Sequence, residues 1–284
     1  MKFEKSVYAW CMYDWANSSF ATTVLTAFFP VFFKSFWNQG VEPTVSTARL
    51  GLATGIGGLA VALLSPVLGA MADAGKAKKK FLAFFMIIGI AMTASLYLVP
   101  TGQWQWAFAL IVFAEVGFSC GNLFYDSLLV NVAKKEEMDA VSSLGYAAGY
   151  AGGGILFAIN VLMTWKPSLF GIHGAANAVR VSFLTVAAWW FVFSAPLFFY
   201  VKEPRLLHIK PLLVIRDGLR RLKSTASKIG ASKPLLMFLV AYWLYIDGIY
   251  TVIFMATDFG LAIGLSAVSM MLSILLVQFV AANQ

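Results

Sequence analysis

Four polar side chains recur at helical spacing within the apolar segment 106–130. Glu115, Ser119, Asn122 and Asp126 are separated by four, three and four residues. Because residues three or four apart share one face of an α-helix, these side chains form a polar stripe. An acid in the middle of a membrane-spanning helix costs about 3 kcal/mol or more, so it persists mainly where it faces a water-filled path or a polar partner. The stripe therefore predicts a pathway for a solute or for protons.

A second pair of polar residues lies in the first apolar segment. Asp14 and Asn17 fall in the first third of residues 10–36. They are candidates for a polar gate or a proton-coupled pair at one mouth of the pathway. The alternative is that both are helix-start residues, since an acid near a helix N-terminus complements the helix dipole.

A third acid lies near the middle of a later apolar segment. Asp247 has Tyr250 and Thr251 at adjacent helical positions. We expect Asp247 and Glu115 to face one central cavity, because each is an acid at mid-depth with polar neighbours. For Glu115 the alternative is a structural acid satisfied by hydroxyl groups.

The composition indicates which elements must position these residues. The chain has 284 residues, of which 60% are hydrophobic and 12% are charged, whereas an average soluble domain is about 25% charged. Runs of about 20 apolar residues, the length that crosses a hydrocarbon core, recur eight times. We therefore expect an all-α polytopic membrane protein with spans at about residues 10–36, 49–72, 81–100, 105–130, 141–164, 178–201, 235–257 and 263–282.

The positive charges are distributed asymmetrically between the two sides of this topology. Of 21 Lys and Arg residues, only Lys34, Arg49, Lys166 and Arg180 fall on one side, which leaves 17 on the other. The positive-inside rule then places the N-terminus in the cytoplasm. Membrane topology explains the net charge of +8, so we expect no nucleic-acid partner. The expected location is a bacterial inner membrane.

A basic segment divides the chain into two parts. Residues 1–201 hold six expected spans and form an N-terminal bundle, and residues 235–284 hold spans 7 and 8 of a partial C-terminal bundle. Between them, residues 202–234 form a cytoplasmic linker in which leucine and isoleucine alternate with arginine and lysine. This pattern suits an amphipathic helix on the inner leaflet; a solvated basic loop is the alternative.

The connection after span 2 resembles the cytoplasmic signature of the major facilitator superfamily. Residues 69–80 read GAMADAGKAKKK. Gly69 allows close helix approach, and Asp73 can pair with a helix N-terminus or a cation in one conformational state. Together with Lys76 they are candidates for conformational gating. An ordinary positive-inside loop with a helix-ending Asp is the alternative.

Span 1 carries a more specific resemblance. Residues 13–18 read YDWANS and are followed by Phe20 and Ala21, which resembles the first span of the vacuole effluxer-like family within that superfamily. Further matches are NLFYDSLL at 122–129, SLGYAAGYAGG at 143–153 and YIDGIYT at 245–251. The second of these, at 143–153, adds Tyr146 to the candidate pathway. The family includes fungal vacuolar amino-acid effluxers and bacterial members.

The resemblance implies two six-helix halves around a central cavity, with alternating access by rocking of the halves. The sequence departs from that pattern, because it contains only about 8 of the 12 expected spans. We expect a truncated product or fragment, or else an eight-span member. Spans 7 and 8 should pack on the first six through small residues, notably Gly260, Gly264 and Ser266.

The function expected from these patterns is secondary active transport. The substrate would be a small solute, an amino acid for efflux by family analogy, with protons carried by acids such as Glu115 or Asp247. The alternative is a non-transporting fragment or assembly partner. A membrane enzyme would need clustered ligands or a nucleophile and base, and His173 and His208 fall in loops on opposite sides. We therefore expect no enzymatic activity, no cofactor and no metal; the partners are the lipid bilayer, the solute and protons.

Overall fold

The structure is a computed structural model of the chain. It describes residues 3–74, 77–203, 220, 224, 227, 229–230 and 232–282. Most of the basic segment 202–234 lies outside these residues, and so do Lys76 and the side chain of Asp73. The amphipathic helix, the domain boundaries and the charged part of the gating motif therefore remain predictions.

The described chain is built from helices joined mainly by short turns. The first span, Lys5–Trp37, is continuous but alternates along its length between α-helix and π-helix, with two segments of each. The elements are α1 (Lys5–Ser19), η1 (Phe20–Phe28), α2 (Phe29–Phe32), η2 (Phe33–Trp37), α3 (Pro43–Ala74), α4 (Lys78–Ser95), η3 (Leu96–Leu98), α5 (Trp104–Ser127), α6 (Leu129–Val132), η4 (Lys135–Glu137), α7 (Met138–Trp165), η5 (Pro167–Phe170), α8 (Ala175–Tyr200), α10 (Lys233–Ala262) and α11 (Ala267–Ala281).

Seven of these helical segments are long and apolar enough to cross a membrane. They match the first seven expected spans, which confirms the prediction of a polytopic all-α protein. The eighth expected span differs, because α11 has 15 residues. Gly264 adopts a left-handed turn with φ 93°, and Ser266 caps the helix by accepting a hydrogen bond from the Ser269 backbone N–H. The turn and the cap delay the start of the helix beyond the start of the apolar run.

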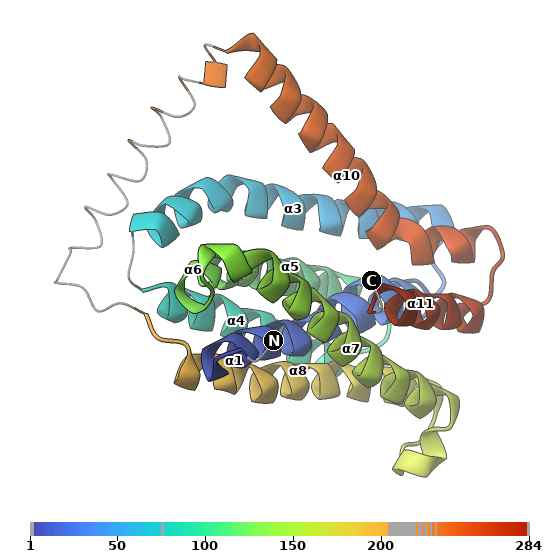
Figure 1. The fold of residues 1–284 in the computed structure, drawn as a ribbon. Helices are drawn as coiled ribbons and strands as arrows, with labels where there is room; N and C mark the ends of the chain where they lie inside the picture. The colour runs from blue at the N-terminus through green and yellow to red at the C-terminus, as the bar shows by residue number, and fades with distance from the viewer. Residues whose placement is uncertain are drawn as a thin grey trace.

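The helices of the first six spans run roughly parallel between two faces of the bundle, and α10 runs obliquely to them (Figure 1). We call the face where α1 begins the N-terminal face, and the face where η2 meets α3 the opposite face. Neighbouring pairs within the bundle are α1 with α7 and α8, α4 with α5 and α8, and α3 with α5. The pathway candidates of α1 and α5 therefore lie inside one packed unit.

Glycines of α7 allow α1 to approach closely. A side chain at Gly152 would collide with the backbone carbonyl oxygen of Trp15 and would come 2.7 Å from its ring. A side chain at Gly153 would lie 3.0 Å from the Thr22 hydroxyl. Small residues at such contacts let helix backbones pack tightly within a membrane. The same contact brings the polar residues of α1 against α7.

The last two helices contact the first bundle differently from the sequence expectation. Gly260 packs against Met270 of α11, so it serves the contact between α10 and α11 rather than the first six spans. Gly264 forms the turn and Ser266 the cap described above. Contact with the first bundle comes instead from the end of α10 and from α11, where Gln278 lies against Gly154 of α7.

Candidate solute pathway

A direct hydrogen bond joins the polar residues of the first and fourth spans. Asn17 Nδ2 on α1 donates to Asn122 Oδ1 on α5 over 2.5 Å. Asn17 is 2% exposed, and Asn122 is half-buried. Two side-chain amides placed on separate spans by their sequence patterns therefore meet in the bundle.

Asp14 lies one helical turn before this amide pair. Its carboxylate accepts a hydrogen bond from Ser18 Oγ over 3.2 Å. Both groups point at Gly149 of α7, where an added Cβ would lie 2.6 Å from Ser18 Oγ and 3.1 Å from Asp14 Cγ. The absent side chain of Gly149 thus makes room for polar atoms at this helix contact.

The glycine face of α7 also receives a polar group from α5. A Cβ at Gly145 would lie 3.4 Å from the Tyr125 hydroxyl. This hydroxyl is buried and has no hydrogen-bond partner among the described residues. The Tyr125 ring stacks between Trp10 and Tyr13 of α1, with centroid distances of 4.4 and 4.9 Å. An aromatic stack therefore holds an unpaired hydroxyl one turn from Asp14.

Two further candidates, Asp126 and Tyr146, lie near Asp14. Asp126 is exposed on α5 and lies within electrostatic range of Asp14. Tyr146 is exposed on α7, within electrostatic range of both acids and of Tyr250 on α10. We call the set Asp14, Asn17, Ser18, Asn122, Asp126 and Tyr146 the polar cluster. It joins α1, α5 and α7 in the half of the bundle toward the N-terminal face.

Glu115 lies elsewhere on α5, at the contact with α3. Its carboxylate packs against Gly57, where an added Cβ would collide with Oε2 and lie 2.9 Å from Cδ. Glu115 is 7% exposed, and no hydrogen-bond partner is found for it in the described part of the chain. No hydroxyl therefore satisfies it there. Ser119, the next member of the stripe, is half-buried.

Asp247 and Thr251 are exposed on α10. The stretch of α10 that carries them contains no buried residue. A cavity shared by Asp247 and Glu115 therefore stays a prediction. Gly69 lies near the end of α3 with open space around its Cα.

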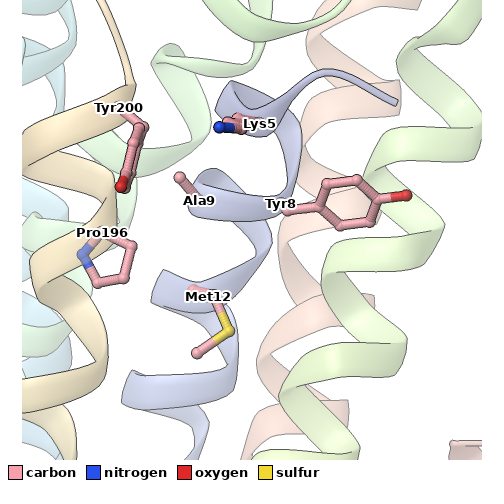
Figure 2. Close-up of a pocket in the computed structure, with 6 residues that line it drawn as sticks. All are labelled: Lys5, Tyr8, Ala9, Met12, Pro196 and Tyr200. Carbon is pink, nitrogen blue, oxygen red and sulfur yellow. The ribbon is translucent and has the colours of Figure 1, made fainter. Parts of the chain in front are cut away.

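An open depression on the N-terminal face lies between α1 and α8 (Figure 2), and its lining includes no member of the polar cluster. Its lining is mostly apolar, and Figure 2 shows the Tyr8 ring turned away from Pro196 and Tyr200. The lining residues are Lys5, Tyr8, Ala9, Met12, Pro196 and Tyr200. Lys5 is the one charged group among them, so the depression offers little for polar recognition.

Sequence reasoning missed a buried ion pair at the opposite face. Lys34 Nζ of η2 lies 2.7 Å from Asp258 Oδ1 of α10. The sequence offered one signal for this pair: Lys34 is a cation near the end of the first span, and Asp258 is an acid near the end of the seventh. In the predicted topology these two spans end on the same side of the membrane.

This helical arrangement is that of the major facilitator fold. The chain is similar to the crystal structure of a D-xylose–proton symporter, with a TM-score of 0.60, 14% identity, and coverage of 98% of this chain and 66% of that one. It is also similar to a partially occluded inward-open conformation of the xylose transporter XylE from E. coli, with a TM-score of 0.58 and 11% identity over 98% of this chain and 70% of that one. At such low sequence identities the structural similarity shows the fold alone.

The chain belongs to the vacuole effluxer Atg22-like family, whose model matches residues 44–138 and 130–283. This confirms the resemblance seen in the sequence motifs. An uncharacterized MFS-type transporter of Bacillus subtilis, YxiO, is 36% identical over 283 residues, which cover 99% of this chain and 66% of that protein. Autophagy-related protein 22 of Pichia angusta is 22% identical, over 87% of this chain and 61% of that protein. The chain thus spans slightly less than two thirds of these relatives.

Proposed function

We propose that the protein is a secondary active transporter that moves a small solute by alternating access. Amino acids, for efflux, are the proposed solute class, by analogy with the fungal vacuolar effluxers of the family. Family membership and the major facilitator fold support this proposal. The observation that assigns this function to particular residues is the hydrogen bond between Asn17 and Asn122, which joins the polar faces of two spans inside an apolar bundle.

The polar cluster offers the chemistry that an amino acid requires. The carboxylates of Asp14 and Asp126 can attract an ammonium group, and the amides of Asn17 and Asn122 supply both donors and acceptors. Tyr146 of α7 and Tyr250 of α10 add aromatic hydroxyls from the two parts of the chain. A solute that bound among these groups would contact both parts, as alternating access requires.

Glu115 is the proposed proton carrier, with Asp247 as a second candidate. Glu115 is buried and lacks a hydrogen-bond partner within the described residues, so its charged form is poorly stabilised there. An acid at mid-depth in a span commonly marks an ion or proton path. We also propose that Gly69, Asp73 and Lys76 gate the conformational change, and that the protein lies in a bacterial inner membrane with its N-terminus in the cytoplasm.

Counterflow in proteoliposomes tests the proposal. Vesicles are loaded with unlabelled amino acids and diluted into a mixture of labelled ones, with and without a pH gradient. We expect label to accumulate, the gradient to alter the rate, and Asp14→Asn and Asn122→Ala each to lower the rate by about tenfold or more, the scale of a lost charged or buried hydrogen bond. Asp139→Asn is the matched control, because Asp139 is exposed in the first turn of α7. Accumulation no greater than in protein-free vesicles would contradict transport.

A further inference from the structure

The end of α10 is tied to the first bundle by one carboxylate. Asp258 Oδ1 pairs with Lys34 Nζ at 2.7 Å, and the Asp258 side chain is 2% exposed while that of Lys34 is 18% exposed. Asp258 Oδ2 accepts a hydrogen bond from Thr47 Oγ1 of α3 over 2.6 Å. Both oxygens of this acid are therefore used, one toward span 1 and one toward span 2.

The neighbouring residue makes a second tie. Thr257 Oγ1 donates to the backbone carbonyl oxygen of Thr26 over 2.5 Å. Thr26 lies in η1, the π-helical part of span 1. Such segments are rare and are often found at functional sites. We call Lys34, Thr47, Thr257 and Asp258 the latch.

The rest of α10 lacks comparable ties. Within the described residues, every side-chain hydrogen bond or ion pair found between α10 and the preceding spans involves Thr257 or Asp258. The buried residues of α10 are Thr257, Asp258 and Gly260. In Figure 1, α10 meets α3 near the opposite face and diverges from it toward the N-terminal face. The contact of α10 with the preceding spans is thus concentrated at one face.

The other cations near the opposite face have their own partners. Arg49 donates to Asn38 Oδ1 over 2.6 Å and lies 3.9 Å above the Trp104 ring. Arg180 donates to the carbonyl oxygen of Tyr97 over 2.6 and 2.9 Å. Lys34 is therefore the cation that neutralises Asp258 in this arrangement.

We propose that the latch holds the opposite face closed and must break before that face can open. The proposal rests on the transport function above and adds the residues that select between its conformations. Removing one member of a buried ion pair leaves an unpaired buried charge, which is strongly unfavourable. Opening the face would separate the pair and expose both charges to water. The latch therefore stabilises one discrete state and is lost in the other.

Cross-linking between the two parts tests the latch without any measurement of transport. In a background with Cys11→Ala and Cys120→Ala, the pair Thr26→Cys and Thr257→Cys reports how often the end of α10 lies against span 1. A short bifunctional thiosulfonate reagent is added to membranes, and the rate of cross-linking is measured. The reporter pair removes the Thr257 hydroxyl from every variant alike, so differences between variants come from the changes at the other latch residues.

We expect Lys34→Asp to lower the cross-linking rate by about tenfold, because two acids would then face each other in a buried site. The charge swap Lys34→Asp with Asp258→Lys should return the rate to within about twofold of the starting value, since the pair is rebuilt with the same combined length. Lys166→Asp is the matched control: it makes the same charge change at an exposed residue of the same face and should leave the rate unchanged.

Two results would overturn the latch. One is an unchanged rate in Lys34→Asp, and the other is a lowered rate that the swap fails to restore. Thr47→Val keeps the charges and removes one hydroxyl donor to the Asp258 carboxylate, so it should lower the rate by about tenfold, the scale of a hydrogen bond to a charged group. An unchanged rate there also counts against the proposal. If cross-linking follows the charge pair but counterflow is absent, the latch stands and the transport proposal fails.

Discussion

Glu115 and Gly57 should be energetically coupled, because the carboxylate occupies the space that a side chain at position 57 would need. An added Cβ at Gly57 would collide with Glu115 Oε2 and lie 2.9 Å from Cδ. Glu115 is 7% exposed, so its carboxylate has little room to move aside. Replacing Gly by Ala within a helix is favourable by about 1 kcal/mol, whereas overpacking a core costs about 1–3 kcal/mol. We therefore expect Gly57→Ala to change the free energy of unfolding by between about 0 and 2 kcal/mol, in the destabilising direction.

The same substitution should become favourable once the obstruction is removed. In a Glu115→Ala background, Gly57→Ala should gain the helix preference of about 1 kcal/mol without the overpacking cost. The double-mutant cycle then gives a coupling energy of about 1–3 kcal/mol. The assay is SDS titration in mixed micelles, with helix content followed by circular dichroism.

Gly58→Ala is the matched control, since an added Cβ there meets nothing within 4 Å. It should stabilise the protein by up to about 1 kcal/mol with either residue at position 115. A coupling below about 0.5 kcal/mol between positions 57 and 115, or an equal coupling at position 58, would refute the placement of Glu115 against α3.

Three further predictions concern packing, helix ends and topology. Gly152→Ala should lower the apparent melting temperature in detergent, whereas Gly58→Ala should not, because the added Cβ at position 152 meets the backbone of Trp15, which cannot move aside; equal effects would contradict the tight α1–α7 contact. Lys79→Met should destabilise the bundle by about 1–3 kcal/mol, because Lys79 Nζ donates to two carbonyl oxygens at the end of α8; an unchanged unfolding curve would count against this. In intact cells, an impermeant thiol reagent should label Gln39→Cys but not Ser224→Cys, as the distribution of cations predicts. Labelling at position 224 would contradict the predicted orientation of the chain in the membrane.

The spans were predictable because each depends on local composition. An apolar run long enough to cross a bilayer forms a helix whatever its neighbours are, since no water is available to its backbone groups. The start of the last helix was less predictable from hydropathy, although Ser266 before an apolar run is a recognised helix-start signal. The π-helical segment Phe20–Phe28 left no such signal, because an ordinary helical period describes its sequence equally well.

The pairing of polar residues depended on tertiary contacts that spacing alone does not contain. The sequence placed Asn17 and Asn122 each on a polar face, but their hydrogen bond depends on how α1 packs beside α5. Asp258 was missed because it falls at the end of its span, where an acid can reach water and its burial cost does not indicate a function. Only the fold reveals that its partner is Lys34, far away in the sequence.

The central claim, that the polar cluster is the solute pathway, is tested most directly by protection of a thiol at position 122. In the background with Cys11→Ala and Cys120→Ala, Asn122→Cys is treated with a small maleimide, with and without each amino acid. Because the loss of the Asn122 amide weakens binding, each amino acid is raised to at least about tenfold above the concentration that saturates counterflow. We predict that the transported amino acids slow alkylation at 122 in a saturable manner, while Asp139→Cys, exposed in the first turn of α7, reacts at the same rate throughout. An alkylation rate at 122 that no amino acid changes would contradict the assignment.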